Sequence, residues 1–172
     1  GNFMRSWGEG IFTRPHGVYI ASDDSIWCTD DVDHTVRKFD TNGNLLMTLG
    51  VRGQYSDTGY DGRNLASIKR AGPPFNRPTK CTVAPSGELY VTDGYGNARV
   101  HKFAPDGRHL LSWGEPGKGP GQFHLPHCVV VDRRGRVYVA DRENLRVQVF
   151  TSDGRFIAMW PNVQRPNDMF LD

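Results

Sequence analysis

The sequence contains neither an excess of charge of one sign nor a long apolar run. Its 172 residues include 21 Lys and Arg against 19 Asp and Glu, for a formal net charge of +2. An extended basic surface for nucleic acid is therefore not expected. No stretch approaches the roughly 18 consecutive apolar residues of a membrane-spanning helix, so no span is predicted. Residues 1–5 do not resemble a secretory leader, and the compartment stays open.

Cysteine is scarce as well. The three thiols, Cys28, Cys81 and Cys128, form no closely spaced pair. An odd count without paired spacing argues against a disulfide framework and against a paired-cysteine zinc motif, and we expect small buried thiols. The sequence also lacks a Gly-x-Ser-x-Gly elbow and a glycine-rich phosphate loop before a helix. With 37% hydrophobic residues, the chain is long enough to bury a core.

What the sequence does contain is an internal repeat. Four segments begin alike, at 14–18 (RPHGV), 77–81 (RPTKC), 125–129 (LPHCV) and 165–169 (RPNDM). In the first three units an aspartate follows the proline by fifteen residues. Further along each unit, an expected strand that contains Lys or Arg ends in phenylalanine. The motif recurs roughly every 40 to 48 residues once the polar stretch 52–74 is set aside as an inserted loop.

Within each unit, short alternating strands are separated by turn residues. The runs 18–20, 26–30, 35–39 and 45–49 are typical of strands, and Asn42-Gly43 and Asp153-Gly154 indicate hairpins. Four short antiparallel strands per unit predict an all-β fold, a β-propeller of four-stranded blades. A sandwich or a β-solenoid is the less favoured alternative.

The sequence holds about three and a half such blades. The expected ranges are 11–50, 75–114 and 123–160, with 163–172 as the start of a further blade. Residues 3–8 resemble the end of an outer strand, in register with 110–114. Open rings expose strand edges, so we expect a propeller segment whose ring is completed by further chain or by self-association.

The residue after each proline reads His16, Thr79, His127 and Asn167. In a propeller this register lies at one end of the central channel, so the two histidines are expected to converge on a zinc ion. The alternative is a turn in which each imidazole bonds a neighbouring backbone carbonyl. A catalytic zinc uses about three protein ligands, and this register supplies two.

A second cluster follows the second strand of each unit. Asp30, Asp93 and Asp141 are expected to accept backbone N–H bonds and hold the following turn. Just beyond these aspartates, Tyr95 between two glycines can be a general base or a packed aromatic. Arg142 can bind a carboxylate or pair with a neighbouring acid.

Four other histidines, His34, His101, His109 and His124, share no register and are expected to be ordinary surface or edge residues.

The units resemble NHL repeats. The segments 14–18, 91–99, 113–117, 119–123, 125–127 and 140–144 together resemble the peptidyl-α-hydroxyglycine α-amidating lyases. That resemblance implies a six-bladed propeller, of which this chain would cover the second to fourth blades and the start of the fifth. The implied reaction cleaves a peptidyl-α-hydroxyglycine, or a smaller N-acyl-hydroxyglycine, to an amide and glyoxylate.

The resemblance also implies roles for individual residues. His16 and His127 match two of three zinc histidines, Tyr95 a catalytic tyrosine and Arg142 the arginine of an Asp-Arg-Glu-Asn motif. Val18 falls where a backbone carbonyl helps to bind calcium in the channel. The third histidine and a first-blade arginine fall outside this sequence, so we expect weak zinc binding and poor turnover unless another chain completes the ring.

Two other functions remain open. A non-catalytic NHL propeller would present a face for protein or ligand binding, and His16 and His127 would then have no metal to hold. A hydrolase-like or lactonase-like propeller would carry calcium on the axis, for which only Asn167 and Asp168 are suggestive.

Overall fold

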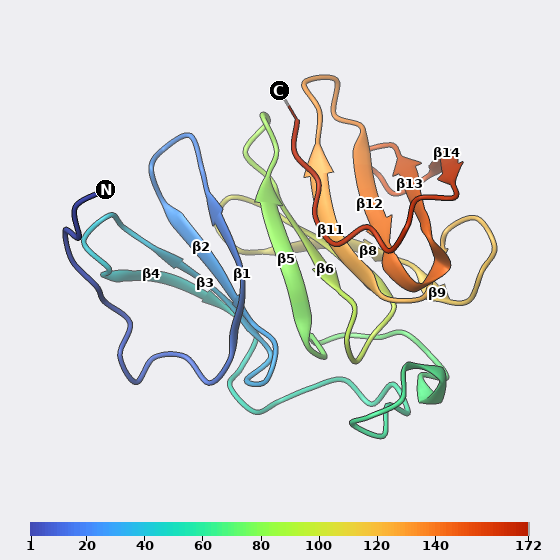
Figure 1. The fold of residues 1–172 in the computed structure, drawn as a ribbon, viewed down its shortest axis with the longest axis horizontal. Coiled ribbons are helices and arrows are strands. Elements are labelled where there is room, and N and C mark those ends of the chain that lie inside the picture. Colours follow the sequence, from blue (N-terminus) through green and yellow to red (C-terminus); the bar gives the residue numbers. More distant parts are fainter. Residues whose placement is uncertain (172) are drawn as a thin grey trace.

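The computed structural model describes residues 1–171, and its strands form three four-stranded antiparallel sheets that stand side by side (Figure 1). The first sheet consists of β1 (Pro15–Ile20), β2 (Ile26–Asp30), β3 (Thr35–Phe39) and β4 (Leu45–Leu49). The second consists of β5 (Pro78–Val83), β6 (Leu89–Asp93), β7 (Arg99–Phe103) and β8 (His109–Trp113). The third consists of β11 (Pro126–Val131), β12 (Val137–Asp141), β13 (Arg146–Phe150) and β14 (Phe156–Pro161).

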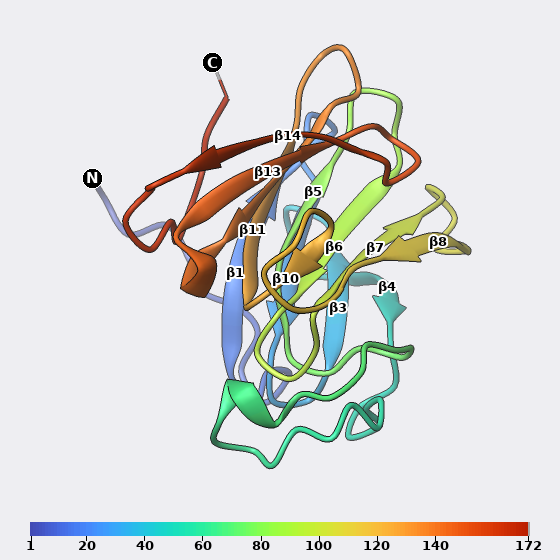
Figure 2. The same ribbon diagram turned by 90° about the vertical axis from the view of Figure 1, so that its right-hand side faces the viewer.

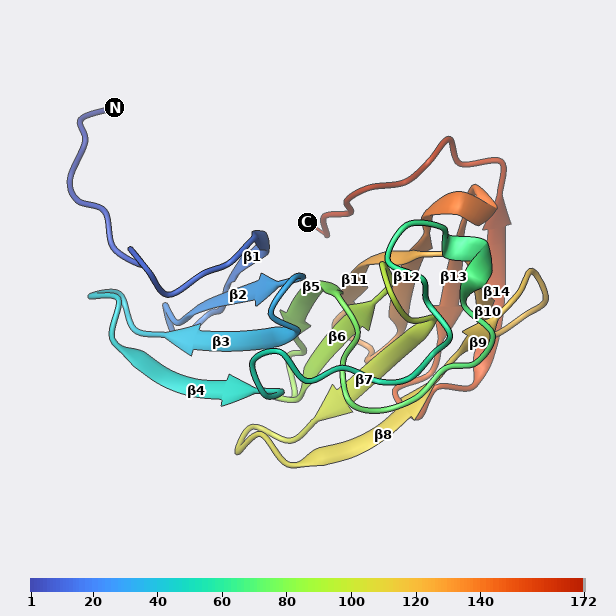
Figure 3. The ribbon, with the colours of Figure 1, turned by 90° about the horizontal axis from the view of Figure 1, so that it is seen from below.

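Each sheet is a propeller blade whose strands follow chain order from the inside outward. Seen from below, the blades fan out, with β4 and β8 on the outer side (Figure 3). Among the inner strands, β5 contacts both β1 and β11. A two-stranded parallel pair, β9 (Glu115–Pro116) and β10 (Gln122–Phe123), links the second blade to the third. The all-β propeller fold expected from the repeat is confirmed for these three blades.

The repeated motif occupies the same structural position in all three blades. Its proline begins the inner strand and pairs with the aspartate that ends the second strand: Pro15 with Asp30, Pro78 with Asp93 and Pro126 with Asp141. Directly after each proline the register shifts by a bulge. Bulges re-aim the side chains beside them, and here they fall at the register of His16, Thr79 and His127.

Apolar side chains fill the spaces between neighbouring blades. One cluster lies between the first and second blades and contains Trp27, Val36, Phe75 and Val91. A second lies between the second and third blades, where Tyr90, Val100, Phe123 and Phe150 pack together. Each blade therefore buries its faces against its neighbours rather than within itself, which fixes the inner strands relative to one another.

The repeated aspartates are structural, as expected. Asp30, Asp93 and Asp141 have no exposed surface. Asp30 accepts the N–H groups of Thr13 and Arg14 and of the turn that follows it. Burial opposes ionisation of Asp30, but the several backbone donors outweigh it and lower the pKa of its carboxyl group.

The inserted loop, residues 52–74, lies across the same end of the blades as the starts of the inner strands (Figures 1 and 2). It contains one short 3₁₀ turn, η1 (Leu65–Ser67). Hydrogen bonds attach the loop to the second blade: Thr58 Oγ1 donates to Gly96 O at 2.6 Å in a buried contact, and Asn97 Nδ2 donates to Gly72 O at 2.7 Å in a part-buried one. The loop is thus a fixed wall of this end of the molecule.

The two chain ends do not form the expected strands within residues 1–171. Residues 3–8 form no strand, but Trp7 packs on Phe39 with ring centroids 4.9 Å apart, as Trp113 packs on Phe150, which agrees with the expected register. Residues 163–171 form no strand either, although they run beside β11 (Figure 1). A strand needs a hydrogen-bonded neighbour, and the described residues pair none with these segments. Asp172 lies outside the described residues. No helix within residues 1–171 has the length and apolarity that a membrane crossing requires.

Candidate functional site

The four residues proposed from the sequence to carry the chemistry meet at one point near the axis. His16 lies on β1, His127 on β11, Tyr95 in the turn after β6, and Arg142 at the start of a short 3₁₀ turn, η2 (Arg142–Asn144). His16 Nε2 and His127 Nε2 are each 3.1 Å from the Tyr95 hydroxyl oxygen. The two imidazole rings have centroids 5.1 Å apart.

The other nitrogen of each imidazole is held by a backbone carbonyl. His16 Nδ1 lies 2.7 Å from Thr79 O, and His127 Nδ1 lies 2.6 Å from Asn167 O. A carbonyl oxygen can only accept, so each Nδ1 must carry the proton. In the neutral imidazoles, both Nε2 atoms therefore present lone pairs toward the same point. The carbonyl-bonded alternative for the Pro-His motif is therefore observed at Nδ1 of each ring. Nε2 of each ring faces the Tyr95 hydroxyl, and its binding of zinc stays a prediction.

The Tyr95 hydroxyl cannot satisfy both imidazoles. It carries one proton and can donate it to one Nε2 atom, which leaves the second Nε2 facing an oxygen lone pair. Arg142 Nη1 approaches the same oxygen at 3.4 Å, so the hydroxyl also has a donor directed at it. A cation between the two imidazoles would satisfy the lone pair that the tyrosine cannot.

Burial favours the neutral form of one of these histidines. Desolvation lowers the pKa of His127, the hydrogen bond to Asn167 O opposes this with a smaller effect, and the nearby Arg142 and His16 add to the lowering. A neutral imidazole with Nδ1 hydrogen-bonded to a carbonyl is the form in which histidine binds a metal ion through Nε2.

The described residues fit a zinc ion in donor type and direction, but they supply only two donors. Among residues 1–171, no group of three or more His, Cys, Asp or Glu side chains is placed to hold a metal. Thr79, in the same register, is no substitute, because its hydroxyl is buried and donates toward Thr92 and Pro126. Further ligands of a tetrahedral zinc would come from substrate, water or chain outside these residues.

One carboxylate, that of Glu143, orients the Arg142 side chain. Its Nε donates to Glu143 Oε1 at 2.8 Å, and Arg165 pairs with the same carboxylate oxygen at 2.7 Å. The guanidinium lies over the Tyr95 ring, 5.6 Å from its centroid. Because Glu143 takes Nε, the terminal nitrogens stay directed at the tyrosine hydroxyl. The two roles considered for Arg142 are thus compatible.

The glycines on either side of Tyr95 place its turn between two blades. A methyl group at Gly94 would overlap the backbone carbonyl of Pro126, and one at Gly96 would overlap the side chain and carbonyl of Asn76. Only glycine permits this approach. The sequence showed the two glycines, but not the contacts that require them.

Replacing Gly94 with alanine is therefore expected to destabilise the fold by about 1–3 kcal/mol, the usual cost of overpacking. Urea unfolding would measure the change. Gly72→Ala is the matched control, since nothing lies within 4 Å of the added methyl group and the backbone there is not left-handed. Equal stability of the two variants would contradict this account of the turn.

Val18 lies apart from the four-residue cluster. It faces a broad cleft of about 1050 Å³ between the inner strands and residues 169–171. Calcium takes six to eight oxygen ligands, whereas the charged side chains lining this cleft are Asp23, Lys38 and Lys80. Asp168 forms an ion pair with Lys80. The described residues do not form a calcium site by themselves, and the calcium role of Val18 stays a prediction.

Sequence reasoning misjudged two histidines. His34 and His101 are 7% and 2% exposed, not surface residues. His34 Nδ1 accepts the Arg77 N–H at 3.1 Å. His101 lies between Ser112 Oγ at 2.8 Å and Asp93 Oδ2 at 3.3 Å. Both are satisfied polar side chains inside the fold. The three cysteines are buried and free, as expected.

Comparison with known proteins gives a family model and several relatives. The NHL repeat model matches residues 75–103 and 123–150, which contain the inner three strands of the second and third blades. NHL repeat-containing protein 3 of Homo sapiens is 37% identical, over 94% of this chain and 46% of that protein. Peptidyl-alpha-hydroxyglycine alpha-amidating lyase 1 of Drosophila melanogaster is 33% identical, over 94% of this chain and 30% of that protein. The chain thus spans less than half the length of either relative.

Among solved structures, a streptogramin B lyase superposes with a TM-score of 0.62 at 15% identity, over 87% of this chain and 41% of that one. At this identity the likeness shows the fold alone.

Proposed function

Because the chain carries NHL repeats of a β-propeller and has peptidyl-α-hydroxyglycine α-amidating lyases among its homologues, we propose that the protein cleaves a peptidyl-α-hydroxyglycine to a peptide amide and glyoxylate. The observation that carries the proposal is the convergence of His16, His127, Tyr95 and Arg142 on one hydroxyl position. Zinc and the complete ligand set are part of the proposal.

The reaction needs no oxidant. The substrate hydroxyl loses its proton, its oxygen forms a carbonyl, and the bond from carbon to the amide nitrogen breaks with its electron pair. The nitrogen then takes up a proton. A zinc ion on His16 Nε2 and His127 Nε2 would lower the pKa of a bound hydroxyl group.

The side chains of this chain supply proton transfer and charge recognition. Tyr95 is placed to accept or relay the hydroxyl proton, because its own oxygen lies between two imidazoles and an arginine. Arg142 is placed to bind the glycine carboxylate, since guanidinium groups match carboxylates in geometry and charge. In the neutral form of each histidine, the Thr79 and Asn167 carbonyls hold the ring proton on Nδ1 and so leave the lone pair on Nε2.

A non-catalytic NHL propeller is the second candidate. The structure gives one observation in its favour: the Tyr95 hydroxyl lies within hydrogen-bond distance of both imidazoles and can donate its proton to one of them. In that case the cluster would be a packed polar group beneath a binding face.

The test is metal content by elemental analysis, with the molar mass in solution recorded on the same sample, followed by a glyoxylate assay. The lyase proposal expects near-stoichiometric zinc in an assembled species and glyoxylate release from a hydroxyglycine peptide. A complete propeller that binds no zinc and releases no glyoxylate would reject it in favour of the binding module.

A further inference from the structure

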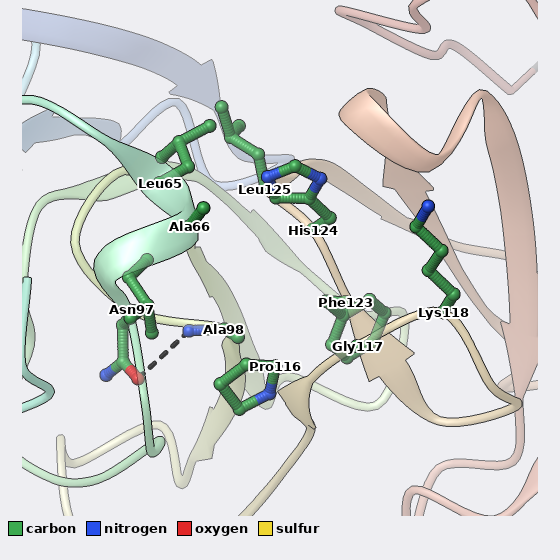
Figure 4. Close-up of a pocket in the computed structure, with 11 residues that line it drawn as sticks. Leu65, Ala66, Asn97, Ala98, Pro116, Gly117, Lys118, Phe123, His124 and Leu125 are labelled. Atoms are coloured by element: carbon green, nitrogen blue, oxygen red, sulfur yellow. Dashed lines mark hydrogen bonds between the residues drawn. The ribbon is translucent and has the colours of Figure 1, made fainter.

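A pocket of about 260 Å³ lies between the inserted loop, residues 97–98 of the second blade and the segment 116–125 that leads to the third blade. Leu65, Ala66 and Ile68 of the loop form one wall, and Phe123 and Leu125 form the opposite wall. Figure 4 shows Leu65 and Ala66 on the turn η1 facing Leu125 and His124. Ala98 and Pro116 close the pocket, and Lys118 and His124 are its basic residues.

The walls of this pocket are fixed before any ligand arrives. Ile68, Phe123 and Leu125 are buried. The Asn97 side chain, in the turn between β6 and β7, donates to Gly72 O of the loop and to Asp93 Oδ2 at the end of β6. A preformed apolar concavity binds with little ordering cost.

Backbone hydrogen bonds connect the pocket to the cluster. The Arg142 N–H donates to Leu125 O and the Glu143 N–H donates to His124 O, both at 3.0 Å. Leu125 is also two residues from His127, and Asn97 is two residues from Tyr95. The main chain that carries Arg142 is therefore the hydrogen-bonded neighbour of the pocket wall at His124 and Leu125.

We propose that this pocket binds the apolar side chain of the peptide residue that precedes the hydroxyglycine, an inference that rests on the proposed lyase function. Pockets for whole small ligands measure roughly 300–1,000 Å³, so this smaller one suits a single large side chain. Its walls are apolar, and its basic residues suit no cationic side chain. The substrate class is then a peptide that ends in a large apolar residue followed by hydroxyglycine.

The kinetic experiment compares N-acetyl-phenylalanyl-hydroxyglycine with N-acetyl-glycyl-hydroxyglycine in the zinc-loaded, assembled protein. We expect kcat/KM to favour the phenylalanyl substrate by about 10-fold or more, the scale set by filling an apolar pocket. Ala66→Trp should fill the pocket and remove most of this preference, mainly through KM. Arg63→Ala, an exposed change in the same loop and outside the pocket, is the control.

A binding experiment separates the pocket from the chemistry. N-acetylphenylalaninamide, which has neither hydroxyl group nor carboxylate, should shift the methyl NMR signals of Leu65, Ala66, Ala98 and Leu125, whereas N-acetylglycinamide should not. If Ala66→Trp does not fold, Leu65→Ala serves as the second variant. It removes part of the apolar wall without filling the pocket, and it should weaken these shifts. Methyl signals that do not shift, or an unchanged substrate preference in Ala66→Trp, would overturn the pocket inference. Binding of N-acetylphenylalaninamide without glyoxylate release from any peptide would instead overturn the lyase proposal, and the pocket would remain a site for an apolar side chain.

Discussion

Replacing Tyr95 with phenylalanine is expected to lower kcat for glyoxylate release by about 10²–10⁴-fold, the usual contribution of a positioned proton-transfer group. The ring would still pack against His16 and His127, which meet it edge-on at 5.1 and 5.7 Å between centroids. Only the oxygen that both Nε2 atoms and Arg142 approach would be lost. The effect should therefore fall on kcat more than on zinc content.

The matched control is Tyr138→Phe, which removes a hydroxyl group that bonds Asp132 at 3.1 Å in the third blade, away from the cluster. It should leave kcat within about twofold of the parent. Kinetics and elemental analysis of both variants on the same preparations would measure the difference. Glyoxylate release by Tyr95→Phe at the parent rate would refute the role given to the hydroxyl group.

The sequence predicted which side chains would converge near the axis better than it predicted what surrounds them. His16 and His127 were found because a fixed spacing from proline to aspartate places both at one register, and the structure gives that spacing a physical basis in the Pro15–Asp30 and Pro126–Asp141 pairs. A repeat carries this information along the chain, since equivalent positions of successive blades surround one axis.

The groups that orient these side chains left no trace in the sequence. Thr79 and Asn167 hold the histidines through their carbonyl oxygens, and every residue type has a carbonyl. In the sequence, these two positions differ from the other two units only in having no histidine after the proline. Their function depends on contacts 63 and 40 residues apart in the chain. Burial of His34 and His101 was missed for the same reason, because the partners that satisfy them are distant or lie on a neighbouring strand.

The pocket lined by the inserted loop could not be predicted either. The polar stretch 52–74 reads as an insertion that interrupts the repeat, and its composition indicates only a loop. Its position against the second blade follows from buried hydrogen bonds such as Thr58 Oγ1 to Gly96 O. A segment that departs from the repeat is thereby attached beside Tyr95, and residues of its 3₁₀ turn line the pocket.

Substituting either cluster histidine is expected to have the second large effect, on metal affinity. Changes to groups that merely orient a metal ligand typically cost 10–100-fold in affinity, so loss of a ligand in His127→Ala or His16→Ala should weaken zinc binding by more than about 100-fold. Titration with a competing chelator would measure it. His109→Ala is the control, because its ring contacts Ser112 on the outer strand of the second blade.

The same variants distinguish the enzyme from the binding module through stability. A ligand present at 100 times its Kd stabilises a fold by about 2.7 kcal/mol. Chelator should therefore lower the free energy of unfolding of the parent and of His109→Ala by about that amount, and leave His16→Ala and His127→Ala nearly unaffected. The two histidine substitutions combined should weaken zinc binding by much less than the product of the single effects, since each alone already breaks the site. If chelator changes the free energy of unfolding of neither the parent nor any single variant, the imidazoles hold no metal. The cluster is then the packed polar group of a non-catalytic propeller.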